Sequence, residues 1–161
     1  MNAVSKTKKI KYLLGSIVAI PLKENKFAFA KTFKDGDLGI YDLVSKLILP
    51  LEDVIKHRIS FYQYSTDAAI KNGDWPILGV EPFADGDEAW LPPMATCYIR
   101  EADKWTMGKP RVNFKDEGYF VSLKEVHGLD IFSVCDRPES TVRVIEDRLI
   151  KGNHDNYRVK G

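Results

Sequence analysis

Three stretches near the start of the chain are apolar over the length of a β-strand. They are residues 17–22, 27–33 and 38–44. Asn25, in the first polar connection between them, suits a positive φ, and the second connection, Asp35-Gly36-Asp37, is a turn sequence. Apolar runs joined by such short turns predict an antiparallel meander over residues 15–44.

Beyond the meander, strand-like and helical patterns alternate along the chain. Residues 58–64 alternate as in a strand and are rich in aromatic side chains. Residues 75–80 predict a strand whose proline at position 76 favours a sheet edge, and the large ring of Trp75 is expected in the core. Residues 140–151 predict a helix, because apolar side chains recur at helical spacing at Val142, Ile145 and Leu149.

Together these elements predict an α+β fold. We expect a mainly antiparallel, strongly curved or barrel-like sheet, a few short helices and a C-terminal helix. A chain of 161 residues suits a single domain. We therefore expect a basic N-terminal tail at residues 1–14, one globular domain at 15–152, and a polar, loose C-terminal tail at 153–161.

Composition narrows the classes of function. Hydrophobic residues make up 44% of the chain and charged residues 29%, which is typical of a globular protein. The net charge of +1 gives no general reason to expect nucleic acid as a partner. No apolar run reaches about 18 residues, so no membrane span is expected. The two cysteines, Cys97 and Cys135, are far apart and indicate reduced thiols rather than a disulfide framework.

Two short motifs suggest metal sites, but neither is complete. Gly152-Asn153-His154-Asp155 resembles one block of the calcineurin-like metallophosphoesterases, whose other ligand blocks this chain lacks. The two Asp-Gly-Asp sequences fail the EF-hand pattern, because Ile40 and Trp90 stand where that loop needs glycine. We therefore expect no metal site, and Asp-Gly is instead a usual hairpin-turn signal.

Catalytic motifs are equally sparse. The chain has no Gly-x-Ser-x-Gly elbow and no phosphate-binding glycine loop. A nucleophile pair formed by Cys97 or Cys135 with His127 stays open as an alternative, although Asp136 beside Cys135 disfavours a thiolate. We predict that the protein is no enzyme and needs no cofactor.

The segment from Glu81 to Trp90 is the least ordinary part of the sequence. It contains four carboxylates and two aromatic residues but neither lysine nor arginine. Such a run is often a solvated loop. The alternative is a protein-binding surface whose charge steers a basic partner while an aromatic side chain makes the contact. The candidate binding residues are Glu81, Asp85, Asp87, Glu88 and Trp90.

The aromatic residues leave a second function open. A curved sheet with exposed rings and basic neighbours stacks single-stranded nucleic acid. The candidates are Phe61, Tyr62, Tyr64, Trp75, Trp90 and Trp105, and the N-terminal tail adds Lys6, Lys8, Lys9 and Lys11. Because Arg58 is nearly alone among basic residues beside the aromatic strand, core packing accounts better for most of these rings.

Several segments resemble the immunity protein 26 family. The opening of that family is similar to residues 15–22, 26–30 and 38–42 of this chain. Its central tryptophan-containing strand resembles Asp74-Trp75-Pro76-Ile77-Leu78-Gly79, and its C-terminal end resembles the helix with residues 143–149. The family usually has Gly-Asp at the first strand, where this chain has Gly15-Ser16.

The resemblance implies a bacterial, cytoplasmic antitoxin of a polymorphic or contact-dependent toxin system. Such a protein protects the producing cell by binding the C-terminal domain of its cognate toxin. The family supplies no catalytic motif that could be carried over to this chain. The toxin, its activity, the interface and the oligomeric state stay open at this point.

Overall fold

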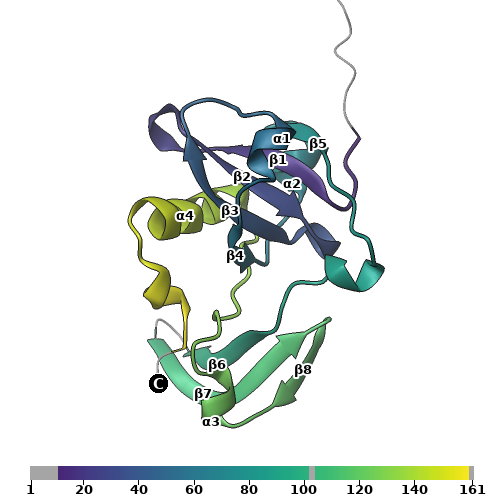
Figure 1. Ribbon diagram of the computed structural model, residues 1–161. Helices are drawn as coiled ribbons and strands as arrows, with labels where there is room; N and C mark the ends of the chain where they lie inside the picture. The colour runs from purple at the N-terminus through teal and green to yellow at the C-terminus, as the bar shows by residue number, and fades with distance from the viewer. Residues whose placement is uncertain (1–10, 102–103, 160–161) are drawn as a thin grey trace, which may run out of the picture.

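Two antiparallel sheets organise the chain, one above the other in Figure 1. The computed structural model describes residues 11–101 and 104–159, with the side chains of 97–109 outside the description. The strands are β1 (Ser16–Pro21), β2 (Phe27–Thr32), β3 (Leu38–Ser45), β4 (Ile59–Gln63), β5 (Ile77–Val80), β6 (Met94–Glu101), β7 (Lys104–Phe114) and β8 (Glu117–Phe120). The α-helices are α1 (Leu51–Val54), α2 (Ala68–Lys71), α3 (Leu123–Val126) and α4 (Pro138–Ile145). None of the described helices is long and apolar enough to cross a membrane.

The first sheet contains five strands in the order β4-β3-β2-β1-β5. Adjacent strands are antiparallel, with Ile20 opposite Ala28 and Ala30 opposite Ile40, which confirms the predicted meander. The connection between β1 and β2 turns through two residues of positive φ, Glu24 at 59° and Asn25 at 55°. This is the twist that a tight hairpin needs. As its proline indicated, β5 lies at a sheet edge.

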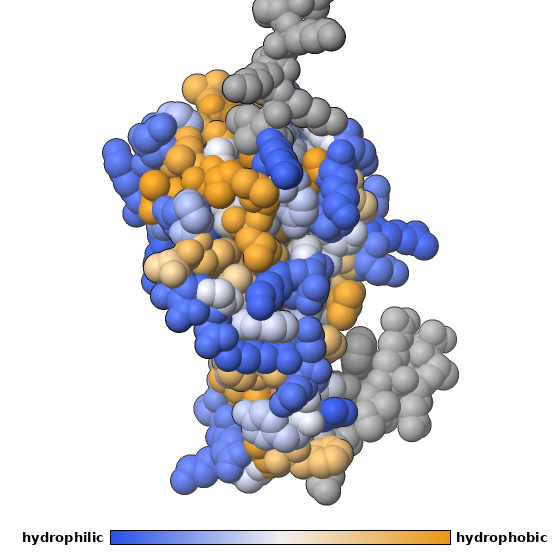
Figure 2. Space-filling model, turned by 90° about the vertical axis from the view of Figure 1, so that its right-hand side faces the viewer, coloured by the Kyte–Doolittle hydropathy of each residue, from blue (hydrophilic) through white to orange (hydrophobic). Residues whose placement is uncertain are grey.

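Both faces of this sheet carry apolar side chains, because alternate residues of each strand point to opposite sides. One face packs with Trp75 beside α2 and with Ile145 of α4. The other face packs with Val54 of α1. Figure 2 shows that hydrophobic side chains gather mainly on the upper part of the molecule, over this sheet. Leu47 and Ile48, in the loop before α1, remain exposed.

The expected strongly curved or barrel-like sheet is not supported. In the described part of the chain, β4 and β5 are the two edges of an open sheet and do not pair with each other. The helices explain why closure is unnecessary: they cover the apolar side chains that a barrel would enclose. The later strands form a separate three-stranded sheet in the order β6-β7-β8.

A connecting segment at residues 130–135 joins the two sheets. It makes one parallel bridge to each, pairing Ile131 with Ala95 of β6 and Val134 with Tyr64 just after β4. The side-chain amide of Gln63 donates to the backbone oxygen of Ser133 at 2.8 Å. The segment therefore belongs to both sheets, although it forms no regular strand.

The C-terminal part of the chain follows the predicted helix and then departs from the prediction. Helix α4 starts at Pro138, which suits a first helical position, and continues as a π-helix, η4 (Glu146–Ile150). We expected a loose tail after it, but parts of residues 153–159 contact the rest of the protein, while Asp155 and Asn156 are exposed. They include a 3₁₀ turn, η5 (His154–Tyr157), the Tyr157 hydroxyl donates to Asp147 at 2.7 Å, and Val159 is buried.

Candidate functional site

The acidic loop, residues 81–90, forms a short 3₁₀ turn, η3 (Gly86–Ala89), between the two sheets. The carboxylate of Asp85 accepts a hydrogen bond from the backbone N–H of Asp87 at 3.0 Å and so caps this turn. Ala89 is buried, whereas Asp85, Asp87 and Glu88 are exposed. The turn therefore presents three carboxylates to solvent.

Glu81 and Trp90, the other two candidate residues, fix the ends of the loop. Glu81 pairs with Lys31 at 2.9 Å, and its backbone N–H donates to the carbonyl of Gly15 at 2.9 Å. Trp90 is half-buried, and the ammonium of Lys34 lies 4.2 Å from the centre of its ring. Glu81 and Trp90 thus hold the two ends of the loop in place, and the carboxylates of Asp85, Asp87 and Glu88 between them face solvent.

Two more turns bring acidic residues to the same region. The ammonium of Lys115, in the turn between β7 and β8, lies 3.2 Å from the carboxylate of Asp87. Its neighbour Asp116 is exposed, as is Asp35 in the 3₁₀ turn η2 (Lys34–Gly36). The sequence did not identify Asp35 and Asp116 as part of this surface. Their turns are far from residues 81–90 in the sequence and come close only because the three-stranded sheet packs there. The acidic surface comprises Asp35, Asp85, Asp87, Glu88 and Asp116.

Asp37 lies just behind this surface and is only 9% exposed. Burial raises the pKa of its carboxyl group to about 7, and Asp35 and Asp116 add to the rise. The backbone N–H of Ser65, 3.3 Å from Asp37 Oδ1, acts in the opposite direction because it stabilises the carboxylate. Asp37 therefore holds its proton in the folded protein under conditions in which an exposed aspartate has lost it.

We expect Asp37→Asn to flatten the pH dependence of stability. A carboxyl group whose pKa is raised by folding stabilises the protein at acid pH, and that contribution is lost as pH rises through about 7. Relative to the variant, the wild type should lose about 2 kcal/mol of unfolding free energy between pH 5 and pH 8. Urea denaturation at several pH values measures this difference. Parallel curves for the two proteins would contradict the expectation.

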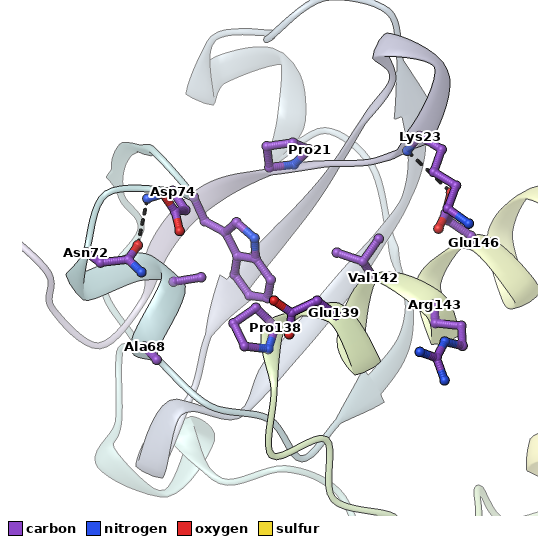
Figure 3. A pocket seen from close by; sticks show the side chains of 12 residues that line it. Pro21, Lys23, Ala68, Asn72, Asp74, Pro138, Glu139, Val142, Arg143 and Glu146 are labelled. Atoms are coloured by element: carbon purple, nitrogen blue, oxygen red, sulfur yellow. Dashed lines mark hydrogen bonds between the residues drawn. The ribbon is translucent and has the colours of Figure 1, made fainter.

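A groove opens between α2 and α4, on the face of the five-stranded sheet that contains Trp75 (Figure 3). Its volume is about 670 Å³, within the range of ligand-binding clefts. Its apolar lining is formed by Pro21, Ala68, Ala69, Trp75, Pro138 and Val142, and its polar lining by Lys23, Asn72, Asp74, Glu139, Arg143 and Glu146. The groove is a second candidate site, which sequence reasoning did not identify.

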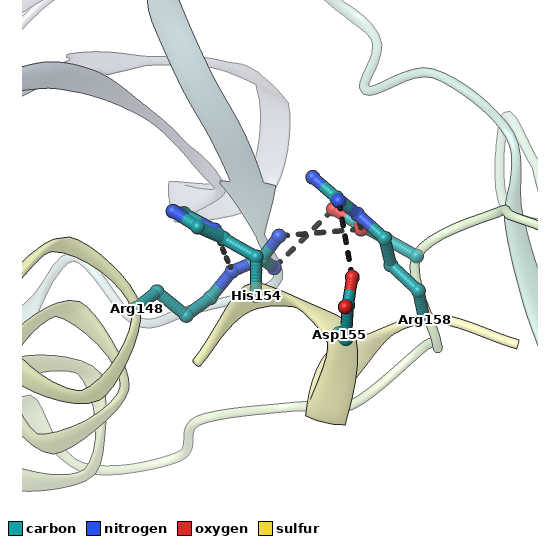
Figure 4. A network of polar contacts seen from close by, with 5 residues as sticks. Arg148, His154, Asp155 and Arg158 are labelled. Carbon is teal, nitrogen blue, oxygen red and sulfur yellow. Dashed lines mark hydrogen bonds and ion pairs between the residues drawn. The ribbon is translucent and has the colours of Figure 1, made fainter. Parts of the chain in front are cut away.

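A polar network surrounds the buried side chain of Arg148, in the π-helix (Figure 4). Its guanidinium donates two hydrogen bonds of 3.3 Å to the carboxylate of Asp130, and its Nε donates to Nδ1 of His154 at 3.2 Å. The guanidinium also lies 4.1 Å from the ring centre of Phe61. Burial lowers the pKa of His154, and the charges of Arg148 and Arg158 lower it further. The network ties the C-terminal helix to both sheets.

The structure shows the surroundings of most of the residues considered for chemistry. His154 Nδ1 accepts a hydrogen bond from the guanidinium of Arg148, so this ring nitrogen is already used and faces a positive charge. No group of three or more His, Cys, Asp or Glu residues in residues 11–101 and 104–159 could hold a metal ion. Cys135 is buried, which raises the pKa of its thiol, and His127 is exposed. The side chain of Cys97 lies outside the description.

The aromatic residues considered for nucleic-acid stacking mostly pack within the protein. Phe61 and Trp75 are buried. Tyr62 meets Phe33 edge to face at 5.5 Å between ring centres, and Tyr64 lies 4.5 Å from Phe132. Rings in such contacts offer little open surface to a base, so this arrangement favours core packing. The side chain of Trp105 and the lysines at positions 6, 8 and 9 lie outside the description.

Comparison with known proteins gives a match to one family. The sequence profile of the family described as Immunity protein 26 matches residues 14–103. These residues include the whole five-stranded sheet and the acidic loop, whereas the helix at 143–149 lies beyond the match. No curated protein and no solved structure matches the chain.

Proposed function

The chain belongs to the immunity protein 26 family, and from this premise we propose that it binds a cognate bacterial toxin domain and neutralises it. The family match over residues 14–103 is the observation that carries the proposal. Immunity proteins are generally not enzymes, and we propose that this one acts by binding alone. We also propose that it acts in the cytoplasm. The buried free thiol of Cys135 supports this, because free thiols are typical of a reducing compartment.

We propose further that the acidic surface contributes to toxin binding. Its five carboxylates outnumber the two lysines that contact the same turns, Lys34 and Lys115. A toxin that acts on nucleic acids or nucleotides carries a basic cleft, and a rigid acidic surface would complement that charge. The short capped turn supports this role, because a preorganised surface loses little conformational entropy on binding.

The direct test looks for a toxin C-terminal domain encoded immediately upstream of the gene and pairs the chain with it. We expect the two purified proteins to form a complex in size-exclusion chromatography. We also expect co-expression of the chain to restore growth of cells that produce the toxin. Absence of both a complex and protection would contradict the proposed function. Pull-down from the native host would then identify the actual partner.

Reversing two charges of the acidic surface should slow toxin association. We choose Asp87→Lys with Glu88→Lys, because Asp85 caps the turn and its replacement would disturb the backbone. The loss of steering should lower the association rate constant about three- to tenfold at low ionic strength. The difference should shrink as salt screens the charges. Stopped-flow measurements across a salt series provide the comparison.

A control variant separates local charge from net charge. Glu52→Lys with Glu125→Lys makes the same change in net charge at exposed positions on α1 and α3, outside the acidic surface. We expect this control to associate nearly as fast as the wild type. If both variants associated equally slowly, the effect would come from net charge and not from the acidic surface. If neither variant changed the association rate, the acidic surface would not be part of the interface.

A further inference from the structure

The groove between α2 and α4 combines apolar walls with carboxylates at one end. The small side chains of Ala68 and Ala69 on α2 leave open space beside the indole of Trp75, and Val142 lies on the α4 side. Apolar walls of this kind suit the methylene stem of a long side chain.

The charges of the groove are unevenly distributed. Asp74 and Glu139 are exposed on opposite walls, and neither forms an ion pair with any residue that the structure describes. In Figure 3 the Glu139 side chain reaches toward the side of the groove that carries Asp74, whereas Arg143 points away. At the other end, Glu146 accepts a hydrogen bond from the backbone N–H of Lys23 at 3.3 Å. The Asp74 end therefore carries two carboxylates without a counter-charge.

We propose that this groove receives an arginine side chain of the toxin. The stem of that arginine lies along the apolar walls, and its guanidinium lies between Asp74 and Glu139. Arginine fits because its planar, always charged group binds carboxylates through several N–H donors, while its methylene stem suits the apolar walls. The proposal rests on the proposed function for the identity of the partner, but the chemistry of the groove can be tested without it.

The first test uses Nα-acetyl-arginine amide as a probe and the indole N–H of Trp75 as the reporter. That NMR signal is assigned by its loss in Trp75→Phe. We expect a saturable shift with arginine and none with Nα-acetyl-citrulline amide, which has nearly the same shape without the charge. Asp74→Asn with Glu139→Gln should weaken binding about three- to tenfold, as expected for two exposed charge contacts. Glu52→Gln with Glu125→Gln, the matched control, should leave it unchanged.

Three results would overturn the proposal. They are the absence of a saturable shift, an equal response to citrulline, and equal binding by the double variant. The second test measures toxin affinity for the Asp74/Glu139 double variant, which we expect to fall by a similar factor. A toxin that binds the wild type and the variant equally would exclude the groove from the interface. A toxin that does not bind the wild type would contradict the proposed function, while the arginine titration would still decide the chemistry of the groove.

Discussion

Replacing Trp75 by alanine should lower the free energy of unfolding by about 3–5 kcal/mol, the usual cost of truncating a buried aromatic side chain. The ring is 3% exposed and packs in the cluster that joins the five-stranded sheet to α4. Its removal takes away apolar contacts and leaves a cavity that the surrounding strands cannot fill completely. Urea denaturation followed by circular dichroism measures the loss.

Trp90→Ala is the matched control for this prediction. Trp90 is half-buried at the end of the acidic loop and contacts Lys34 rather than the core of the sheet. We therefore expect a clearly smaller loss of stability, of roughly 1–2 kcal/mol, in line with ordinary substitutions. If Trp75→Ala kept the unfolding midpoint of the wild type and lost only toxin binding, Trp75 would be a contact residue rather than a core residue.

Arg148→Ala should have an effect of similar size, about 3–5 kcal/mol, because it removes one partner of a buried ion pair. The guanidinium is 2% exposed, donates to Asp130 and His154, and stacks over Phe61. Without it, the ion pair left to Asp130 among the described residues is the longer contact to Arg158, at 3.5 Å. Equilibrium unfolding at pH 7.5 gives the size of the loss.

Two further variants show which property of Arg148 matters. Arg148→Lys keeps the charge but cannot reproduce the two parallel hydrogen bonds, so its stability should lie between those of the wild type and Arg148→Ala. Arg158→Ala removes a partly exposed partner of the same carboxylate and should cost about 1 kcal/mol or less. Equal losses for Arg148→Ala and Arg158→Ala would refute a special role for the buried guanidinium.

The elements that were predicted correctly depend on local patterns. In the meander, the strands follow from apolar runs and the turns from residues such as Asn25 and Gly36, which take positive φ at little cost. The burial of Trp75 follows from its position just before an apolar strand, β5. These features need no knowledge of residues far away in the chain.

The features that were missed depend on contacts between distant residues. Arg148 follows Ile145 at helical spacing and shares its buried face. The sequence analysis instead placed Leu149 on that face, because Leu149 is apolar and Arg148 is charged. Its burial requires Asp130, which lies 18 positions earlier. The composite acidic surface likewise requires the β7–β8 turn to approach η3, which no spacing within residues 81–90 reveals.

The segment at residues 130–135 also affects how the protein behaves among other copies of itself. An uncovered edge strand is a template for aggregation, since its backbone groups can pair with another chain. Here Val134 is bridged to Tyr64, and the N–H of Cys135 donates to the Tyr64 carbonyl at 2.9 Å, so the end of the β4 edge is already occupied. The connecting segment thus protects the protein against intermolecular strand pairing at that end of β4.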